Sequence, residues 1–192
     1  MRLRTGIYGG SFNPIHNGHI LLARKLLNLT DLDEIWFVVS PQNPLKSVSE
    51  LLNDDKRLEL VRMALENECG LVASDYEFHL PKPSYMWDTL QNLSHDYPDR
   101  EFVVIIGADN WNTFNKWYHS EDIVKHYHIV IYPRKGTSLD ITEIPDYVTM
   151  VEAELIDISS TQIRLDIKEG KNICNLVPKQ VCEVIKRDGL YL

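Results

Sequence analysis

The chain has 192 residues, which is enough to bury one sizeable hydrophobic core, and we expect a single domain over residues 1–192. Its 28 acidic residues outnumber its 20 lysines and arginines, and the formal net charge of -8 argues against nucleic acid or an anionic membrane as the main partner. No apolar stretch approaches the ~20 residues of a membrane span, and the N-terminus lacks a signal-peptide pattern, so we expect a cytoplasmic protein.

Apolar runs alternate with segments of helical periodicity along the chain, which is the pattern of a parallel sheet wrapped by helices. The predicted strands are Leu3–Tyr8, Glu34–Ser40, Leu71–Asp75, Phe102–Ile106, His128–Tyr132 and Leu155–Ile158. The predicted helices are His19–Asn28, Asp54–Glu68, Tyr85–Ser94, a short aromatic helix at Trp111–Trp117, Ser160–Lys168 and Pro178–Arg187. Ligands of open α/β sheets bind beyond the carboxyl ends of the strands, so the loops after residues 8, 40, 106, 132 and 158 are expected to face one cleft.

The turn after the first strand has the features of a phosphate site. The glycine pair Gly9 and Gly10 lets the backbone approach a ligand, and the first turn of the following helix offers unpaired N–H groups and a partial positive charge to an anion. His16 and His19 are three residues apart, so both imidazoles can project from the same end of that helix. A glycine pair alone, or one histidine alone, is an ordinary turn or polar residue; the combination predicts a site for a polyphosphate.

A second segment, near the predicted helix Ser160–Lys168, also fits an anion. Ser159 or Ser160 is a good N-cap, and Thr161 and Arg164 follow at helical spacing, so hydroxyls, backbone N–H groups and a guanidinium can converge on one anion. The alternative is a plain helix cap with a surface arginine.

The cysteines argue against a disulfide framework. Cys69, Cys174 and Cys182 are odd in number and lack the close spacing of metal ligands. We therefore expect reduced thiols and no protein metal site.

Two motifs together carry a family resemblance. Residues 10–19 read Gly-x-Phe-x-Pro-x-His-x-Gly-His, and residues 158–164 read Ile-Ser-Ser-Thr-x-Ile-Arg. The pair resembles the signature of nucleotidyltransferases related to class I aminoacyl-tRNA synthetases. The intervening sequence narrows the resemblance to bacterial nicotinate-nucleotide adenylyltransferases over essentially the whole chain, through Lys46 after Pro-x-Asn-Pro, Ser84-Tyr85, Gly107-Ala108-Asp109, Phe114-x-x-Trp117-Tyr118 and Asp188-Gly189-Leu190-Tyr191.

The resemblance implies a Rossmann-like doubly wound parallel sheet with a small C-terminal helical part. It implies adenylyl transfer from ATP to nicotinate mononucleotide, which gives deamido-NAD and pyrophosphate in NAD biosynthesis, with Mg²⁺ bound mainly through the ATP phosphates. The implied catalytic residues are His16, His19, Lys46 and Arg164. The implied ATP-binding residues are Gly9, Gly10, Ser11, Phe12, Gly18, Gly107, Asp109, Ser159, Ser160 and Thr161. The implied mononucleotide-binding residues are Asn43, Tyr85, Met86, Trp117, Tyr118 and Arg134.

The sequence departs from the family pattern in three places that bear on these roles. The stretch Asn43-Pro44-Leu45-Lys46 differs from the family's usual Pro-Pro-His-Lys, which bears on the contacts of Lys46. Asn13 stands where an aspartate is common, and Met86 stands where a threonine often helps to receive the nicotinate carboxylate. From the residues alone, Asp109 could equally cap a helix, Trp117 could belong to the core, and Arg134 could be a solvated loop residue.

Two alternative functions stay open. The acceptor could be another phosphorylated compound, such as nicotinamide mononucleotide or phosphopantetheine. The chain could be a non-catalytic nucleotide-binding module, although such a module would be expected to lose the phosphate donors that this sequence retains. A homo-oligomer is compatible with the sequence.

Overall fold

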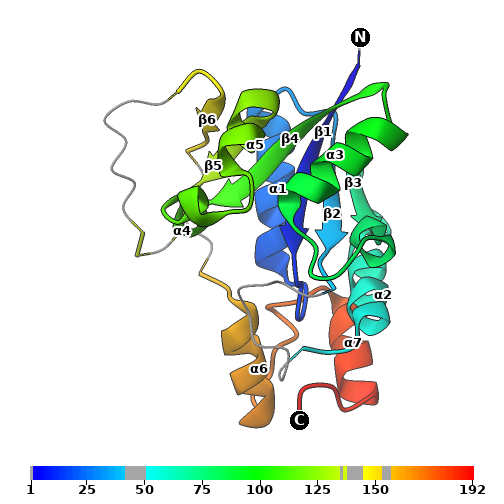
Figure 1. The fold of residues 1–192 in the computed structure, drawn as a ribbon. Coiled ribbons are helices and arrows are strands. Elements are labelled where there is room, and N and C mark those ends of the chain that lie inside the picture. Colours follow the sequence, from blue (N-terminus) through cyan, green and yellow to red (C-terminus); the bar gives the residue numbers. More distant parts are fainter. Residues whose placement is uncertain (1, 42–50, 135, 138–144, 153–156) are drawn as a thin grey trace.

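A six-stranded, all-parallel sheet forms the centre of the computed structural model, which describes residues 2–41, 51–134, 136–137, 145–152 and 157–192 (Figure 1). The strand order is β3-β2-β1-β4-β5-β6. The strands are β1 (Leu3–Gly10), β2 (Glu34–Val39), β3 (Leu71–Ser74), β4 (Arg100–Gly107), β5 (His128–Tyr132) and β6 (Val148–Met150). This order reverses direction at β1 and β4, so the α/β, Rossmann-like, doubly wound prediction is confirmed.

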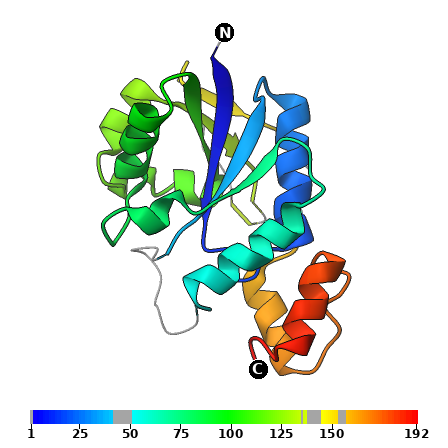
Figure 2. The ribbon, with the colours of Figure 1, turned by 90° about the vertical axis from the view of Figure 1, so that its right-hand side faces the viewer.

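Helices cover both faces of the sheet. They are α1 (Asn17–Leu29), α2 (Asp54–Leu65), α3 (Met86–Asp96), α4 (Ala108–Trp111), α5 (Ser120–His126), α6 (Ser160–Lys168) and α7 (Lys179–Arg187), with short 3-10 helices η2 (Tyr76–His79) and η3 (Phe114–Lys116). Figure 2 shows the sheet between α1 and α2 on one side and α3 and α5 on the other. The central strands β2 and β4 are buried on both faces, which explains their nearly continuous apolar sequences. No described helix is long and apolar enough to cross a membrane.

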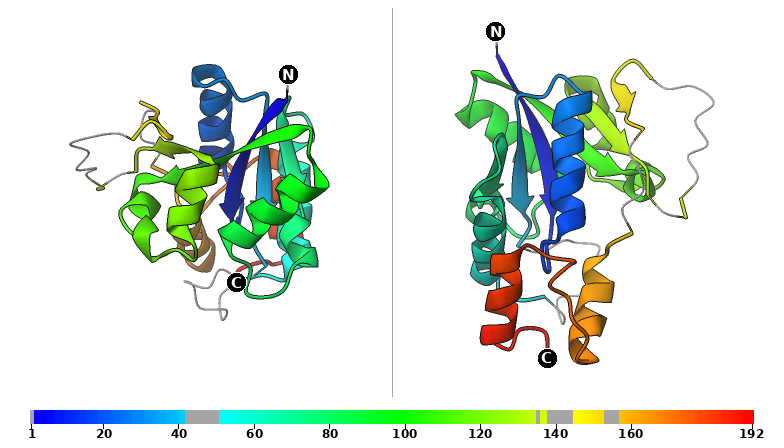
Figure 3. Two further views of the ribbon diagram at one scale, coloured as in Figure 1. Left: turned by 45° about the horizontal axis from the view of Figure 1, so that its top comes forward. Right: turned by 180° about the vertical axis from the view of Figure 1, so that it is seen from behind.

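The C-terminal helices lie apart from these two layers. Figure 3 shows α6 and α7 side by side beyond the carboxyl ends of the strands, below α1 and α2. The apolar side of α7, with Val181, Cys182, Val184 and Ile185, joins the same hydrophobic cluster as α1 and α2. The predicted small C-terminal helical part is therefore present, and it stands next to the edge where the sheet's loops converge.

Some predicted elements differ from the structure. The predicted helix Trp111–Trp117 is split between α4 and η3, and α5, with only seven residues, is too short to show helical periodicity in the sequence. The sixth strand is β6 rather than Leu155–Ile158: residues 153–156 lie outside the described residues, and Asp157 and Ile158 are not in a strand. Of the three residues of β6, only Val148 is buried, so the segment lacks the apolar signal of a strand.

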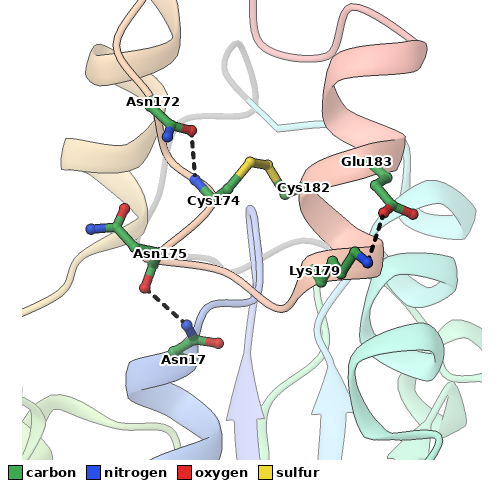
Figure 4. Close-up of a disulfide and its surroundings, with 7 residues drawn as sticks. All are labelled: Asn17, Asn172, Cys174, Asn175, Lys179, Cys182 and Glu183. Atoms are coloured by element: carbon green, nitrogen blue, oxygen red, sulfur yellow. Dashed lines mark hydrogen bonds and ion pairs between the residues drawn. A yellow bond between two sulfur atoms is a disulfide. The ribbon is translucent and has the colours of Figure 1, made fainter.

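The expectation of reduced thiols is wrong for one pair, because Cys174 and Cys182 form a disulfide (Figure 4). The chain turns between α6 and α7 and brings the two Cα atoms to 5.3 Å, well within the range of a disulfide. Cys69 is a free, exposed cysteine. The odd number of cysteines was misleading, because one disulfide and one free cysteine also make three. The other two cysteines meet through a turn that their spacing in the sequence does not reveal.

A buried guanidinium joins the loops at the carboxyl edge. The side chain of Arg57 in α2 has no exposed surface. It donates to the carbonyl oxygens of Ser11 (2.6 Å), Ser40 (2.8 Å), Pro41 (3.2 Å) and Leu52 (3.0 Å). The charge is balanced by Asp54, whose Oδ1 lies 2.7 Å from Nη2. Arg57 thus ties the ends of β1 and β2 to the start of α2.

Replacing Arg57 by methionine should lower the free energy of unfolding by about 3–5 kcal/mol, because four carbonyls and a carboxylate lose a buried partner. Arg62→Met is the matched control: it lies on the same helix, and its exposed ion pair with Asp75 should contribute about 0–1 kcal/mol. Urea denaturation followed by circular dichroism measures both. Equal losses in the two variants would contradict this role of Arg57.

Candidate active site

Two cavities open at the carboxyl edge of the sheet and share a wall. The polar cavity has a volume of about 470 Å³, and the aromatic cavity has a volume of about 350 Å³. Gly9, Gly10 and Asn110 line both. The end of β1 therefore separates two adjoining spaces, and a molecule in one can reach a molecule in the other across the glycine pair.

The polar cavity brings together both sequence motifs. The predicted site residues that line it are Gly9, Gly10, Ser11, Phe12, His16, His19, Asp109, Arg134, Ser159, Ser160, Thr161 and Arg164. Gly18 and Gly107 are buried and do not line it. A Cβ at Gly107 would displace the carboxylate of Asp109, so the glycine leaves room for this side chain to lie against the strand end.

The aromatic cavity brings together another predicted group, consisting of Tyr85, Met86, Trp117 and Tyr118. Arg134, which the sequence grouped with these residues, lines the polar cavity instead, with its Nε 3.5 Å from Asp109 Oδ1. Asn43 and Lys46 fall outside the described residues.

The cavity walls also contain residues to which the sequence assigned no site role. They are Tyr8, Asn13, Ser40, Leu51, Glu77, Ser84, Asn110, Lys116 and Tyr132. Tyr8 stands near the carboxyl end of β1 and Tyr132 at the carboxyl end of β5, on either side of β4, and their hydroxyl oxygens are 3.5 Å apart. Their position at strand ends is a signal that could have identified them. Glu77 lies in a short 3-10 helix that has no readable periodicity.

The two histidines are stacked at the start of α1. Their ring centroids are 3.6 Å apart with planes at 22°. The backbone N–H of His16 donates to Nδ1 of His19 (3.2 Å), so the proton of neutral His19 resides on Nε2. Burial, with a smaller contribution from Arg134, lowers the pKa of His16 to about 3, so its imidazole is neutral at pH 7. Because its proton resides on Nε2, His19 can donate a hydrogen bond from that atom to an anion.

The second motif is bound directly to the first. Ser160 Oγ donates to the carbonyl of Pro14 (2.9 Å), and Arg164 Nη1 donates to the carbonyl of Asn13 (3.0 Å). Ser159 caps α6 by accepting from the N–H of Gln162 (3.1 Å). The start of α6 and the turn before α1 are thus held together as one surface, to which two helix N-termini contribute a positive potential that suits an anion.

The loop that carries the disulfide supports this surface from behind. The N–H of Asn17 donates to the carbonyl of Leu176 (2.9 Å), and its side-chain amide donates to the carbonyl of Asn175 (3.1 Å; Figure 4). Asn17 is the first residue of α1 and follows His16. The connection between α6 and α7 therefore fixes the helix end that presents the histidines.

The aromatic cavity offers flat surfaces and backbone donors. The ring centroids of Trp117 and Phe114 are 5.2 Å apart, and those of Tyr85 and Tyr118 are 4.9 Å apart. Helix α3 begins at Met86 without a side-chain cap, so its first-turn N–H groups are available to a ligand. An aromatic ring that carries a small acceptor group fits such a site.

No described residues form a group of three or more histidines, cysteines, aspartates or glutamates that could hold a metal ion. In the described part of the polar cavity, Asp109 supplies the only carboxylate, and it is paired with Arg134. The described side chains of this cavity therefore do not form a carboxylate cage for a divalent ion.

Comparison with known proteins agrees with this arrangement. Residues 7–166 match the family model described as cytidylyltransferase-like, and the chain is a member of this class. It is 48% identical over 185 residues to a protein from Bacteroides thetaiotaomicron named probable nicotinate-nucleotide adenylyltransferase, covering 96% of this chain and 92% of that protein. A protein of the same name from Flavobacterium johnsoniae is 42% identical over 191 residues, covering 98% and 99%. The chain belongs to the nicotinate-nucleotide adenylyltransferase family.

Solved structures share the fold at lower sequence identity. The nicotinic acid mononucleotide adenylyltransferase of Plasmodium falciparum, complexed with NaAD, matches with a TM-score of 0.83 and 22% identity, covering 98% of this chain and 97% of that chain. A putative nicotinate-nucleotide adenylyltransferase from Vibrio parahaemolyticus matches with a TM-score of 0.71 and 23% identity, covering 96% and 99%.

Proposed function

We propose that this protein transfers the adenylyl group of ATP to nicotinate mononucleotide, producing deamido-NAD and pyrophosphate for NAD biosynthesis. The observation that carries the proposal is the pair of cavities that meet at Gly9 and Gly10, one lined by anion-binding groups and one by aromatic rings. Membership of the nicotinate-nucleotide adenylyltransferase family supports the same reaction. The cytoplasmic location and the single-domain organisation stay predictions.

In the proposed reaction the triphosphate of ATP binds in the polar cavity. His19 donates from Nε2 to the reacting phosphates, and the start of α6, with Thr161 and Arg164, holds the β- and γ-phosphates. Asp109 receives the ribose hydroxyls. Lys46 is proposed to bridge the donor and acceptor phosphates, and Mg²⁺ to enter with ATP and neutralise part of its charge.

The mononucleotide binds in the aromatic cavity. Its pyridine ring lies against Trp117, and its carboxylate accepts hydrogen bonds from the N–H groups at the start of α3. Asn43 is proposed to contact the same substrate. Because a phosphate monoester is a competent nucleophile, it attacks the α-phosphorus in line, and no side chain has to form a covalent intermediate. The protein contributes positioning and donors for the charge that develops on the departing pyrophosphate.

The direct test is pyrophosphate release by the purified protein with ATP, Mg²⁺ and each candidate acceptor. Nicotinamide has an amide at the position of the carboxylate, and its NH₂ group would face a backbone N–H group. That N–H would be left without an acceptor, at a cost of about 1–3 kcal/mol. We therefore expect kcat/KM for nicotinate mononucleotide to exceed that for nicotinamide mononucleotide by roughly ten- to a hundredfold, with no reaction of phosphopantetheine. A preference for the amide or for phosphopantetheine would refute the named substrate, and no turnover at all would favour a binding module.

His19→Ala should lower kcat by about two orders of magnitude, which is typical of losing one donor that acts in the transition state. The control is His95→Ala, which removes an exposed imidazole from the last turn of α3, outside both cavities. Steady-state kinetics and circular dichroism should show two folded proteins of which only the first is impaired. Near-normal turnover by folded His19→Ala would remove His19 from the mechanism.

A further inference from the structure

A buried carboxylate lies in the wall of the aromatic cavity. Glu77, in η2, is only 3% exposed, yet it lines the cavity together with Tyr85, Met86 and Trp117. No described cation forms an ion pair with it. This is an unusual neighbour for a substrate that is itself proposed to carry a carboxylate.

The partners of Glu77 are hydroxyl groups. Its Oε2 accepts from Ser84 Oγ (2.7 Å), and its Oε1 lies 3.0 Å from Thr89 Oγ1. Thr89 Oγ1 is also 3.1 Å from the carbonyl oxygen of Tyr85, but a hydroxyl has a single proton to donate. If Glu77 is protonated, it donates to Thr89, and Thr89 donates to Tyr85, so that every contact is paired. If Glu77 is ionised, the Thr89 hydroxyl can donate to only one of its two acceptors at a time, and the Tyr85 carbonyl still accepts from the Thr89 N–H (3.0 Å).

No described positive charge beside Glu77 compensates its carboxylate for the loss of solvent. The other titratable side chains that line the cavity are Tyr85, Lys116 and Tyr118, and Lys116 is an exposed residue of η3. His79 on the same 3-10 helix and Asp88 on α3 form no described hydrogen bond or ion pair with Glu77. Burial raises the pKa of Glu77, and the hydroxyls of Ser84, Ser40 and Thr89 lower it to a smaller extent.

We propose that Glu77 holds a proton when the cavity receives its anionic acceptor, and that loss of this proton at higher pH weakens the preference for a pyridine carboxylate over the uncharged amide. The proposal rests on the proposed function. Two carboxylates in one small cavity repel each other, whereas the amide of nicotinamide mononucleotide meets no such charge. Glu77 is then a specificity-determining residue whose proton exchanges with solvent, and no covalent step is involved.

The test is the ratio of kcat/KM for nicotinate mononucleotide to that for nicotinamide mononucleotide, measured from pH 6 to pH 9. Titration of ATP, of the catalytic groups and of the acceptor phosphate affects both substrates alike and cancels in the ratio. In the wild-type protein the ratio should fall by about tenfold or more as the pH rises. In Glu77→Gln, which cannot ionise, the ratio should not vary with pH. Glu121→Gln makes the same change at an exposed position of α5 outside the cavity, and it should retain the wild-type slope.

A ratio that is constant with pH in the wild type, or an unchanged slope in Glu77→Gln, would overturn the proposal. If Glu77→Gln does not fold, binding calorimetry of the wild-type protein still tests the proposal. Measurements in two buffers of different ionisation enthalpy give the number of protons taken up when each mononucleotide binds. At a pH where the wild-type ratio has fallen, binding of nicotinate mononucleotide should be accompanied by the uptake of more protons than binding of nicotinamide mononucleotide, and equal uptake would overturn the proposal. If the protein transferred the adenylyl group to neither mononucleotide, the proposed function itself would be refuted.

Discussion

The guanidinium of Arg57 is the point at which the carboxyl edge of the sheet is held together. It binds the carbonyls of Ser11 and Ser40, which follow β1 and β2, and its charge is balanced by Asp54. Asp54 also pairs with Lys82 in the loop before α3, at 3.0 Å. A buried charge is tolerated only where its hydrogen bonds are satisfied, so the loops around it have little freedom to move independently. Both cavities are built on these loops, and their geometry depends on this one side chain.

Under the proposed function, the site binds anions in a protein that is acidic overall. The net charge of -8 offers no general attraction for ATP, so binding depends on local donors: the starts of α1 and α6, the imidazole of His19 and the guanidinium of Arg164. Hydrogen bonds from Ser160 and Arg164 to the turn before α1 make these donors one unit. The disulfide-bearing loop braces the same turn through Asn17. A preorganised set of donors stabilises a transition state without rearranging during the reaction.

The sequence predicted the parts of this protein that depend on local pattern. Both motifs, the βα order and helix α6 could be recognised because apolar runs, glycines and capping residues act over a few positions. Contacts across the fold could not. Arg57 looks like a surface residue of an amphipathic helix, Glu77 lies in a short 3-10 turn, and Arg134 faces the polar cavity only because β5 ends beside β4. The pairing of Cys174 with Cys182 likewise depends on a turn that residue spacing does not encode.

In the proposed function, donor and acceptor occupy separate cavities that meet at Gly9 and Gly10. A crystal structure of the protein with deamido-NAD bound tests it most directly, because the product contains both halves joined by the new bond. We expect the pyridine ring against Trp117 in the aromatic cavity, the adenosine half in the polar cavity and the pyrophosphate over the glycine pair. A dinucleotide with both bases in one cavity, or bound away from the carboxyl edge of the sheet, would contradict it.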